Sequence, residues 1–316
     1  QESMSRYDRM ARRGTRLLNR FYARRARRQP GATAFVSQPE PRTIGMFARG
    51  KQLIAGNYLF AGQLLSGARL EFWDLPQAGA EFQAEAHGCA WLDDLAAVGD
   101  IPARNCAQTW VWQWLERYGR GQGVGWTPDL TGRRLIRWIN HAFFLLQNSE
   151  KAQSDLFFRS LAHQTNFLGK RWHAARPGLA RFEALTGLLY AALSLEGMER
   201  HIPPAQKALA RECASQIDDM GGLSTRNPEE LLEVFTLLSW SALALRETGH
   251  HVTPEHEAAL LRIAPTLRSL RHADGALARF LGGGKGIEGR LEHALAASGV
   301  KPTAPEGLSM GYARLS

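Results

Sequence analysis

Residues 178–196, which read GLARFEALTGLLYAALSLE, decide the fold class of this chain. Phe182, Leu185, Leu189 and Leu193 recur at helical spacing and form an apolar stripe. Glu183, Gly187, Tyr190 and Ser194 follow one another on a neighbouring face of the same helix. The stretch therefore predicts a core helix that carries an acid and a phenol beside a glycine, which leaves room for a ligand.

Helices of this kind continue on both sides of that stretch. Breaks rich in Gly, Pro or Asn separate seven predicted helices, at 105–118, 130–147, 152–173, 178–196, 203–217, 228–248 and 254–272. Pro128, Pro228 and Pro254 each follow a capping residue and precede an acid, as at a helix start. Helices joined by short loops pack as antiparallel pairs, and no exact repeat period favours a solenoid. We therefore expect an all-α, incomplete α/α toroid over residues 105–273.

The segments on either side of the predicted toroid differ from it in composition and pattern. Residues 29–104 contain Pro and Gly clusters between short apolar stretches and predict an irregular segment, with a short strand at the alternating ARLEFW of 68–73. Residues 274–316 are Gly-rich, with a short helix expected at 288–298. We interpret that stretch as β-containing and leading into a β-sandwich domain that is missing from the chain.

Residues 1–28 form an arginine-rich arm. Ten arginines lie between residues 6 and 28, interleaved with Met10, Leu17, Leu18 and Phe21 at helical spacing, which predicts a basic amphipathic helix. Such a helix binds nucleic acid or acidic lipid, or it docks its apolar stripe on the body of the protein. The large apolar side chains favour docking and make nucleic acid the weaker alternative.

Composition limits the partners and cofactors. The chain has 316 residues, 44% of them hydrophobic, and a formal charge of +9, which indicates a globular protein with an anionic partner. Cys89, Cys106 and Cys213 form no CxxC pair, so we expect packing cysteines, no metal site and no cofactor. No apolar run is long enough to predict a membrane span. Residues 1–3, which precede Met4, are excluded from these arguments, and self-association is left open.

Polar and aromatic side chains within the predicted helices are candidates for sugar chemistry. Trp138 and Trp172 could stack on sugar rings, whereas Trp110 and Trp114 share a helix face and are expected in the core. Asn140 and His141 end an apolar stripe, where a lone histidine is commonly a core residue.

Four stretches resemble bacterial heparinase II/III proteins in order and spacing. They are TGRRLIRWINHAFFLL (131–146), KRWHAARPGLARFEALTGLLYAALSLE (170–196), DMGGLSTRNPEELLEVFTLL (219–238) and LRHADGALARFLGGGKGIEGRL (270–291). The resemblance covers about residues 40–316. It implies an N-terminal α/α toroid followed by a β-sandwich, and β-elimination on uronate-containing polysaccharides such as glycosaminoglycans. Periplasmic localisation is implied too, although the sequence alone leaves the compartment unknown and does not exclude the cytoplasm.

The residues that the resemblance assigns to catalysis are only partly present. Lyases of this family carry Asn-His three residues before the glutamate that matches Glu183, and this chain has Leu179 and Ala180 there. Where they carry Tyr-His, it has Glu230 and Leu231. The surviving catalytic candidates are Glu183, Tyr190 and His141. The candidates for substrate binding are Arg134, Trp138, Asn140, Arg171, Trp172, His173, Arg226 and Asn227.

Three functions follow from the sequence. The first is a polysaccharide lyase component that acts on acidic polysaccharide and is incomplete in this chain. The second is non-catalytic binding of an anionic polysaccharide by the basic toroid. The third assigns the arginine-rich arm to nucleic acid.

Overall fold

The computed structural model describes residues 6–37, 43–75, 78–270 and 296. Its elements in chain order are α1 (Arg6–Ala26), α2 (Phe47–Ile54), β1 (Asn57–Phe60), β2 (Gln63–Ser66), η1 (Arg69–Asp74), α3 (Ala80–Gly88), α4 (Trp91–Val98), α5 (Ile101–Tyr118), α6 (Pro128–Asn140), α7 (Ala142–Leu146), α8 (Lys151–Arg171), η2 (Trp172–Ala174), α9 (Leu179–Ser194), η3 (Glu199–His201), α10 (Ile202–Gln216), α11 (Pro228–Glu247) and α12 (Pro254–Ser269).

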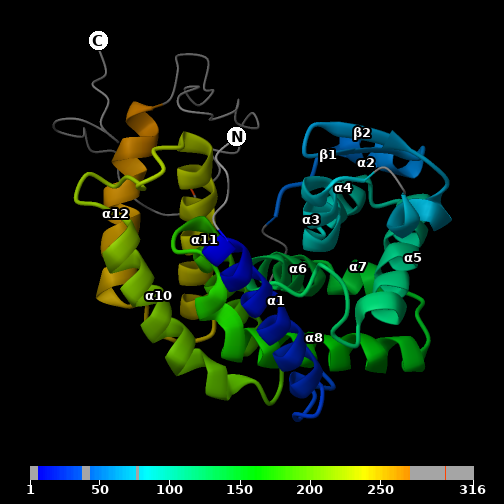
Figure 1. Ribbon diagram of the computed structural model, residues 1–316, viewed down its shortest axis with the longest axis horizontal. Coiled ribbons are helices and arrows are strands. Elements are labelled where there is room, and N and C mark those ends of the chain that lie inside the picture. Colours follow the sequence, from blue (N-terminus) through cyan, green and yellow to red (C-terminus); the bar gives the residue numbers. More distant parts are fainter. Residues whose placement is uncertain (1–5, 38–42, 76–77, 271–295, 297–316) are drawn as a thin grey trace.

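Helices α5 to α12 form the α/α toroid portion, and the predicted all-α fold class is confirmed (Figure 1). The predicted starts at Pro128, Pro228 and Pro254 are the first residues of α6, α11 and α12. The predicted helix at 130–147 is divided between α6 and α7, because the backbone of His141 leaves helical geometry (φ −106°, ψ 18°). Residues 274–316, with the helix expected at 288–298, lie outside the described residues apart from residue 296.

The segment 29–104 is more regular than predicted. It contains α2, α3, α4 and an antiparallel hairpin in which Asn57 pairs with Ser66. The strand predicted at 68–73 is wrong, because this stretch forms the 3-10 helix η1. Its adjacent side chains Phe72 and Trp73 are both buried, which the alternation of a half-buried strand does not allow.

Aromatic side chains join this segment to the toroid. Phe72 stacks on Trp110 with ring centroids 4.1 Å apart, and Trp91 meets Trp110 edge to face at 5.0 Å. Trp110 and Trp114 are fully buried, as predicted from their shared helix face. The three cysteines are free and buried, which confirms their prediction as packing residues. The N-terminal segment and the toroid therefore share one hydrophobic core.

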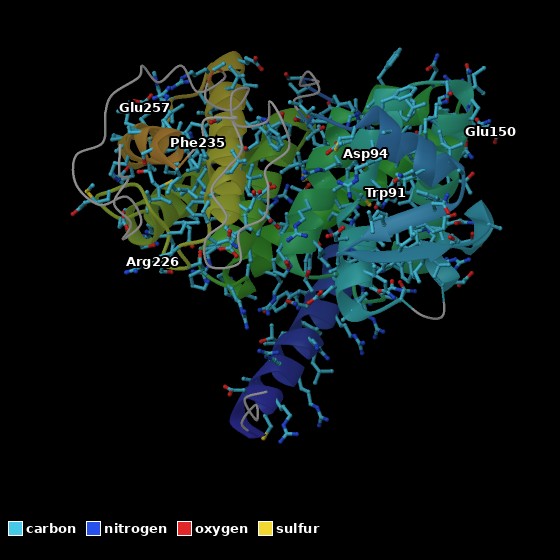
Figure 2. All side chains as sticks on the ribbon, turned by 90° about the horizontal axis from the view of Figure 1, so that it is seen from above. Trp91, Asp94, Glu150, Arg226, Phe235 and Glu257 are labelled. Atoms are coloured by element: carbon cyan, nitrogen blue, oxygen red, sulfur yellow. The ribbon has the colours of Figure 1, made fainter. Side chains whose placement is uncertain are left out.

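Helix α1 docks on α8 through its C-terminal half, whereas its N-terminal half projects from the body (Figure 2). The docked face is made of Asn19, Ala23 and Ala26, all buried. The Arg171 Nε donates a hydrogen bond to Asn19 Oδ1 over 2.8 Å, and the His163 Nε2 lies 2.5 Å from the carbonyl oxygen of Ala23. Two specific contacts thus fix how α1 is rotated on the body.

Candidate functional site

Helices α6 and α9 cross closely and carry the charged residues Arg133 and Glu183 near the crossing. Gly132 and Gly187 meet at this crossing, where a Cβ on Gly187 would lie 2.6 Å from the carbonyl oxygen of Gly132. Neither helix has room for a side chain there. Asp129, Arg133 and Arg137 follow one another at four-residue spacing along α6, on the partly exposed side of that helix.

Glu183 of α9 forms an ion pair with Arg133 of α6. The carboxylate is buried, whereas the Arg133 side chain is 31% exposed. Burial raises the pKa of Glu183 to about 7, with a further raising contribution from Asp129 and Glu233, although Arg133 opposes the shift. Glu183 therefore lies in a charged cluster that includes one partly exposed guanidinium.

The raised pKa of Glu183 predicts a pH dependence of stability. The unfolded carboxyl loses its proton near its ordinary pKa of 4.5, whereas the folded one keeps it until about pH 7. The folded state then binds more protons in this window, so the free energy of unfolding should fall as pH rises from 4.5 to 7. One pKa unit corresponds to about 1.4 kcal/mol.

Urea unfolding of the wild-type protein and of Glu183→Gln between pH 4.5 and 8 measures this contribution. The difference between the two curves isolates Glu183, since all other titrating groups are common to both proteins. Parallel curves would show that burial of Glu183 does not hold its proton.

His141 belongs to a second polar cluster, between α6 and the N-terminal segment. Its Nε2 lies 2.7 Å from Asp93 Oδ1 and 3.1 Å from Thr43 Oγ1, and Arg137 Nε donates to Asp93 Oδ2 over 3.3 Å. Although burial acts to raise it, the pKa of Asp93 is lowered by Arg137 and His141. Both oxygens approach the same ring nitrogen, so Thr43, His141 and Asp93 do not form a nucleophile–base–acid relay, which requires opposite ring nitrogens.

Arg134 is buried and makes four hydrogen bonds within the described part of the protein. Its guanidinium donates to Gln164 Oε1 (2.8 Å), to the carbonyl oxygens of His87 (2.9 Å) and Gly125 (3.1 Å) and to Thr131 Oγ1 (3.2 Å). It also lies 4.2 Å from the centroid of the Trp114 ring. Burial lowers its pKa to about 10. These contacts hold the Arg134 side chain inside the protein, away from solvent.

Three further candidates are buried as well. Trp138 is inaccessible and stacks on Phe157 with centroids 5.6 Å apart, and Tyr190 is 1% exposed. Neither can contact a polymer in this conformation. Asn140 is buried beside His141, and its side-chain amide has no hydrogen-bond partner among the described residues.

The remaining candidates lie on other parts of the molecule. Arg171 is buried against α1, and Asn227 caps α11 by accepting a hydrogen bond from the Glu229 amide over 3.0 Å. Arg226 is exposed, with a φ of 52° in the turn before α11. Trp172 is half-buried, with the Arg181 guanidinium carbon 6.0 Å from the centroid of its ring. The adjacent His173 is exposed. The structure therefore does not bring the predicted substrate-binding residues together into one site.

The outward face of α1 is apolar and exposed. Met10, Leu17 and Phe21 are 71%, 66% and 54% exposed, on the opposite side of α1 from Asn19 and Ala23. The favoured docking of this apolar stripe on the body is therefore wrong. Asn19, Ala23 and Ala26 make the docked face instead, with Tyr22 partly buried beside them, and Met10, Leu17 and Phe21 face solvent among arginines. The amphipathic pattern predicted an apolar stripe on this helix, but such a pattern does not show which face of the helix packs against the protein.

The described residues contain neither a helix suited to crossing a membrane nor a group of three His, Cys, Asp or Glu side chains that could hold a metal ion.

Comparison with known proteins shows the fold. No protein-family profile matches the chain. The chain is 29% identical over 266 residues to FtsZ-localized protein C of Caulobacter vibrioides, which covers 83% of this chain and 45% of that protein. Heparan sulfate lyase HepC from Pedobacter heparinus superposes with a TM-score of 0.56 at 16% identity, covering 93% of this chain and 52% of that one. Heparinase III superposes with a TM-score of 0.57 at 12% identity, covering 82% and 43%. The chain thus spans about half the length of these proteins and has the helical fold of the heparinases.

Proposed function

We propose that this chain is a non-catalytic protein of heparinase-like fold that attaches to acidic membrane surfaces through α1. The observation that carries the proposal is the exposed stripe of Met10, Leu17 and Phe21 on the side of α1 that faces away from the body. A solvent-exposed stripe of this kind, on a helix rich in arginine, is typical of helices that lie in the plane of a membrane interface.

The charge of α1 suits an anionic surface. Its described arginines include Arg13, Arg20 and Arg24, which are exposed beside the apolar stripe. Basic residues near an anionic leaflet each contribute on the order of 1 kcal/mol to binding. Apolar insertion and electrostatic attraction would therefore act on the same helix face.

Membrane attachment predicts a specific vesicle-binding result. The double variant Leu17→Gln/Phe21→Gln should bind vesicles that contain acidic lipid at least tenfold more weakly than the wild type, because each apolar side chain contributes about 1.5–3 kcal/mol when buried. Both side chains are exposed, so the variant should fold normally. Vesicle co-sedimentation measures the change.

Leu64→Gln is the matched control, because Leu64 is also exposed (62%) but belongs to strand β2. It should bind like the wild type. Equal binding of both variants, or equal binding to neutral and acidic vesicles, would refute attachment through α1.

The similarity to FtsZ-localized protein C suggests a place in the cell for this chain. Because that protein is described as FtsZ-localized, we propose that this chain also gathers where FtsZ assembles. A fluorescent fusion that remains dispersed while FtsZ is assembled would count against this part of the proposal.

A lyase acting on acidic polysaccharide is the second candidate. It is favoured by the fold similarity to HepC and by the cluster around Glu183 and Arg133. Non-catalytic binding of the same polymers would use the basic surface of the protein and would appear as competition between heparin and acidic vesicles.

A further inference from the structure

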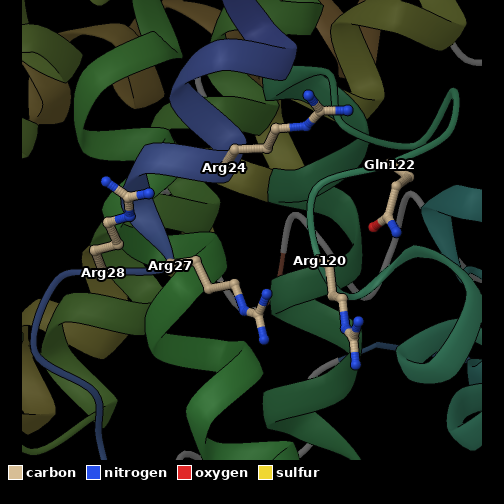
Figure 3. A pocket seen from close by; sticks show the side chains of 5 residues that line it. All are labelled: Arg24, Arg27, Arg28, Arg120 and Gln122. Atoms are coloured by element: carbon tan, nitrogen blue, oxygen red, sulfur yellow. The ribbon is translucent and has the colours of Figure 1, made fainter.

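We propose that Arg24, Arg27, Arg28, Arg120 and Gln122 form a binding pocket for a phosphate-bearing ligand with two or more negative charges. These five residues line a hollow of about 430 Å³ between the end of α1 and the loop that follows α5. In Figure 3, Arg27 and Arg120 extend next to each other, and Arg24 extends on the side of Gln122. The pocket shares Arg24 with the border of the apolar stripe, but no apolar residue of the stripe lines it, and it does not depend on membrane attachment.

The positive charge of this pocket is uncompensated within the described structure. None of the four arginines forms an ion pair or a side-chain hydrogen bond with a described carboxylate, and no acidic residue lines the pocket. Glu116 lines the neighbouring hollow, which shares Arg27 and Arg120 with this one. Arg28 also lines the hollow, although in Figure 3 its side chain extends on the other side of α1 from Arg120. Like charges this near repel one another, and a bound anion would offset the repulsion.

The pocket is held in place before any ligand arrives. Gly121, with a φ of 95°, lets the loop approach α1 so closely that a Cβ there would lie 3.1 Å from the carbonyl carbon of Ala23. On the other side, the carbonyl oxygen of Ala23 accepts a hydrogen bond from His163. Asn166 Nδ2 donates to the carbonyl oxygen of Pro30 over 3.2 Å, which fixes the chain just beyond Arg28. The backbone that carries these arginines is therefore fixed before a ligand binds, which lowers the entropy cost of binding.

The donor set favours phosphate over a single carboxylate. Each guanidinium presents a planar fork of N–H donors that matches two oxygens of one phosphate group. Donors from two chain segments line the hollow, so a group with several oxygens and more than one charge satisfies more of them than a single carboxylate does. A phosphorylated lipid headgroup and a soluble phosphate compound share this chemistry.

Calorimetric titration of the intact chain with pyrophosphate at low salt tests the pocket. We expect saturable binding that Arg27→Gln/Arg120→Gln weakens about a hundredfold, since two charge-assisted contacts are lost. The matched control is Arg9→Gln/Arg16→Gln, which removes the same charge from the part of α1 outside the pocket and should change the affinity less than threefold. Equal weakening in both variants, or no binding at millimolar pyrophosphate, would overturn the proposal.

Thermal unfolding gives a second readout that detects misfolding. Arg27→Gln/Arg120→Gln should melt at or above the wild-type temperature without ligand, because repulsion is relieved, and should lose the rise in melting temperature that pyrophosphate gives the wild type. A ligand-free variant that melts lower yet keeps this rise would argue against the pocket.

Competition with vesicles distinguishes the two sources of phosphate. Pyrophosphate that displaces the chain from vesicles containing a diphosphate lipid would identify a headgroup site, and pyrophosphate that binds without displacing it would identify a soluble ligand. Leu17→Gln/Phe21→Gln should keep its pyrophosphate affinity, so failure of membrane attachment and failure of this pocket give different results.

Discussion

Gly187→Ala is expected to destabilise the protein by about 3 kcal/mol, at the upper end of the cost of overpacking a core. The added methyl group would overlap the backbone of Gly132, which cannot turn aside as a flexible side chain can. Helices α6 and α9 would have to separate, and the Glu183–Arg133 ion pair spans these same helices. Urea denaturation followed by circular dichroism measures the change.

Gly14→Ala is the control, because Gly14 is also a helical glycine but has open space around its Cβ position. This substitution should be neutral or stabilise the protein by up to about 1 kcal/mol, since alanine is the better helix former. A similar loss in both variants would mean that helix propensity, not the crossing, explains the effect.

Incubation of this chain with heparan sulfate or alginate is expected to give no rise in the ultraviolet absorbance of the C4–C5 unsaturated product. β-Elimination needs a group that neutralises the uronate carboxylate and a base within reach of the α-proton, and losing one such group costs a factor of about 10² to 10⁴. Leu179, Ala180, Glu230 and Leu231 stand where the resemblance implies such groups.

The surviving candidates do not replace the missing groups. Tyr190 is buried, and His141 is engaged with Asp93. Glu183 at neutral pH is partly ionised and would repel a uronate. A clear rise in absorbance that disappears in Glu183→Ala would contradict this expectation and would show that the cluster with Arg133 is catalytic. A rise that persists in this variant would point to a different site.

The helices could be predicted from local patterns, whereas the roles of single residues could not. The apolar stripe from Phe182 to Leu193 is a property of one short segment, and so is each proline at the start of a helix. Helices α6, α9, α11 and α12 could therefore be predicted. Helix α3 was missed, because the segment 29–104 is broken by Pro and Gly clusters and lacks a long apolar period.

Arg134 shows why the candidate site was harder to predict. Its acceptors include the carbonyl oxygens of His87 and Gly125, and its ring partner is Trp114. These groups come together only in the folded chain. A buried arginine and a substrate-binding arginine look alike in a sequence until those distant partners are known.

Because α1 is held in one rotational position on the body, it would also determine how the protein is oriented on a membrane. Asn19 and the carbonyl oxygen of Ala23 are hydrogen-bonded to residues of α8. Helix α1 therefore cannot rotate about its own axis, and turn its apolar stripe, without breaking these hydrogen bonds. A body attached by such a helix keeps one orientation relative to the bilayer, unlike a body on a flexible tether, which tumbles. The charged cluster of Arg133 and Glu183 would then face a constant direction at a constant height above the lipid.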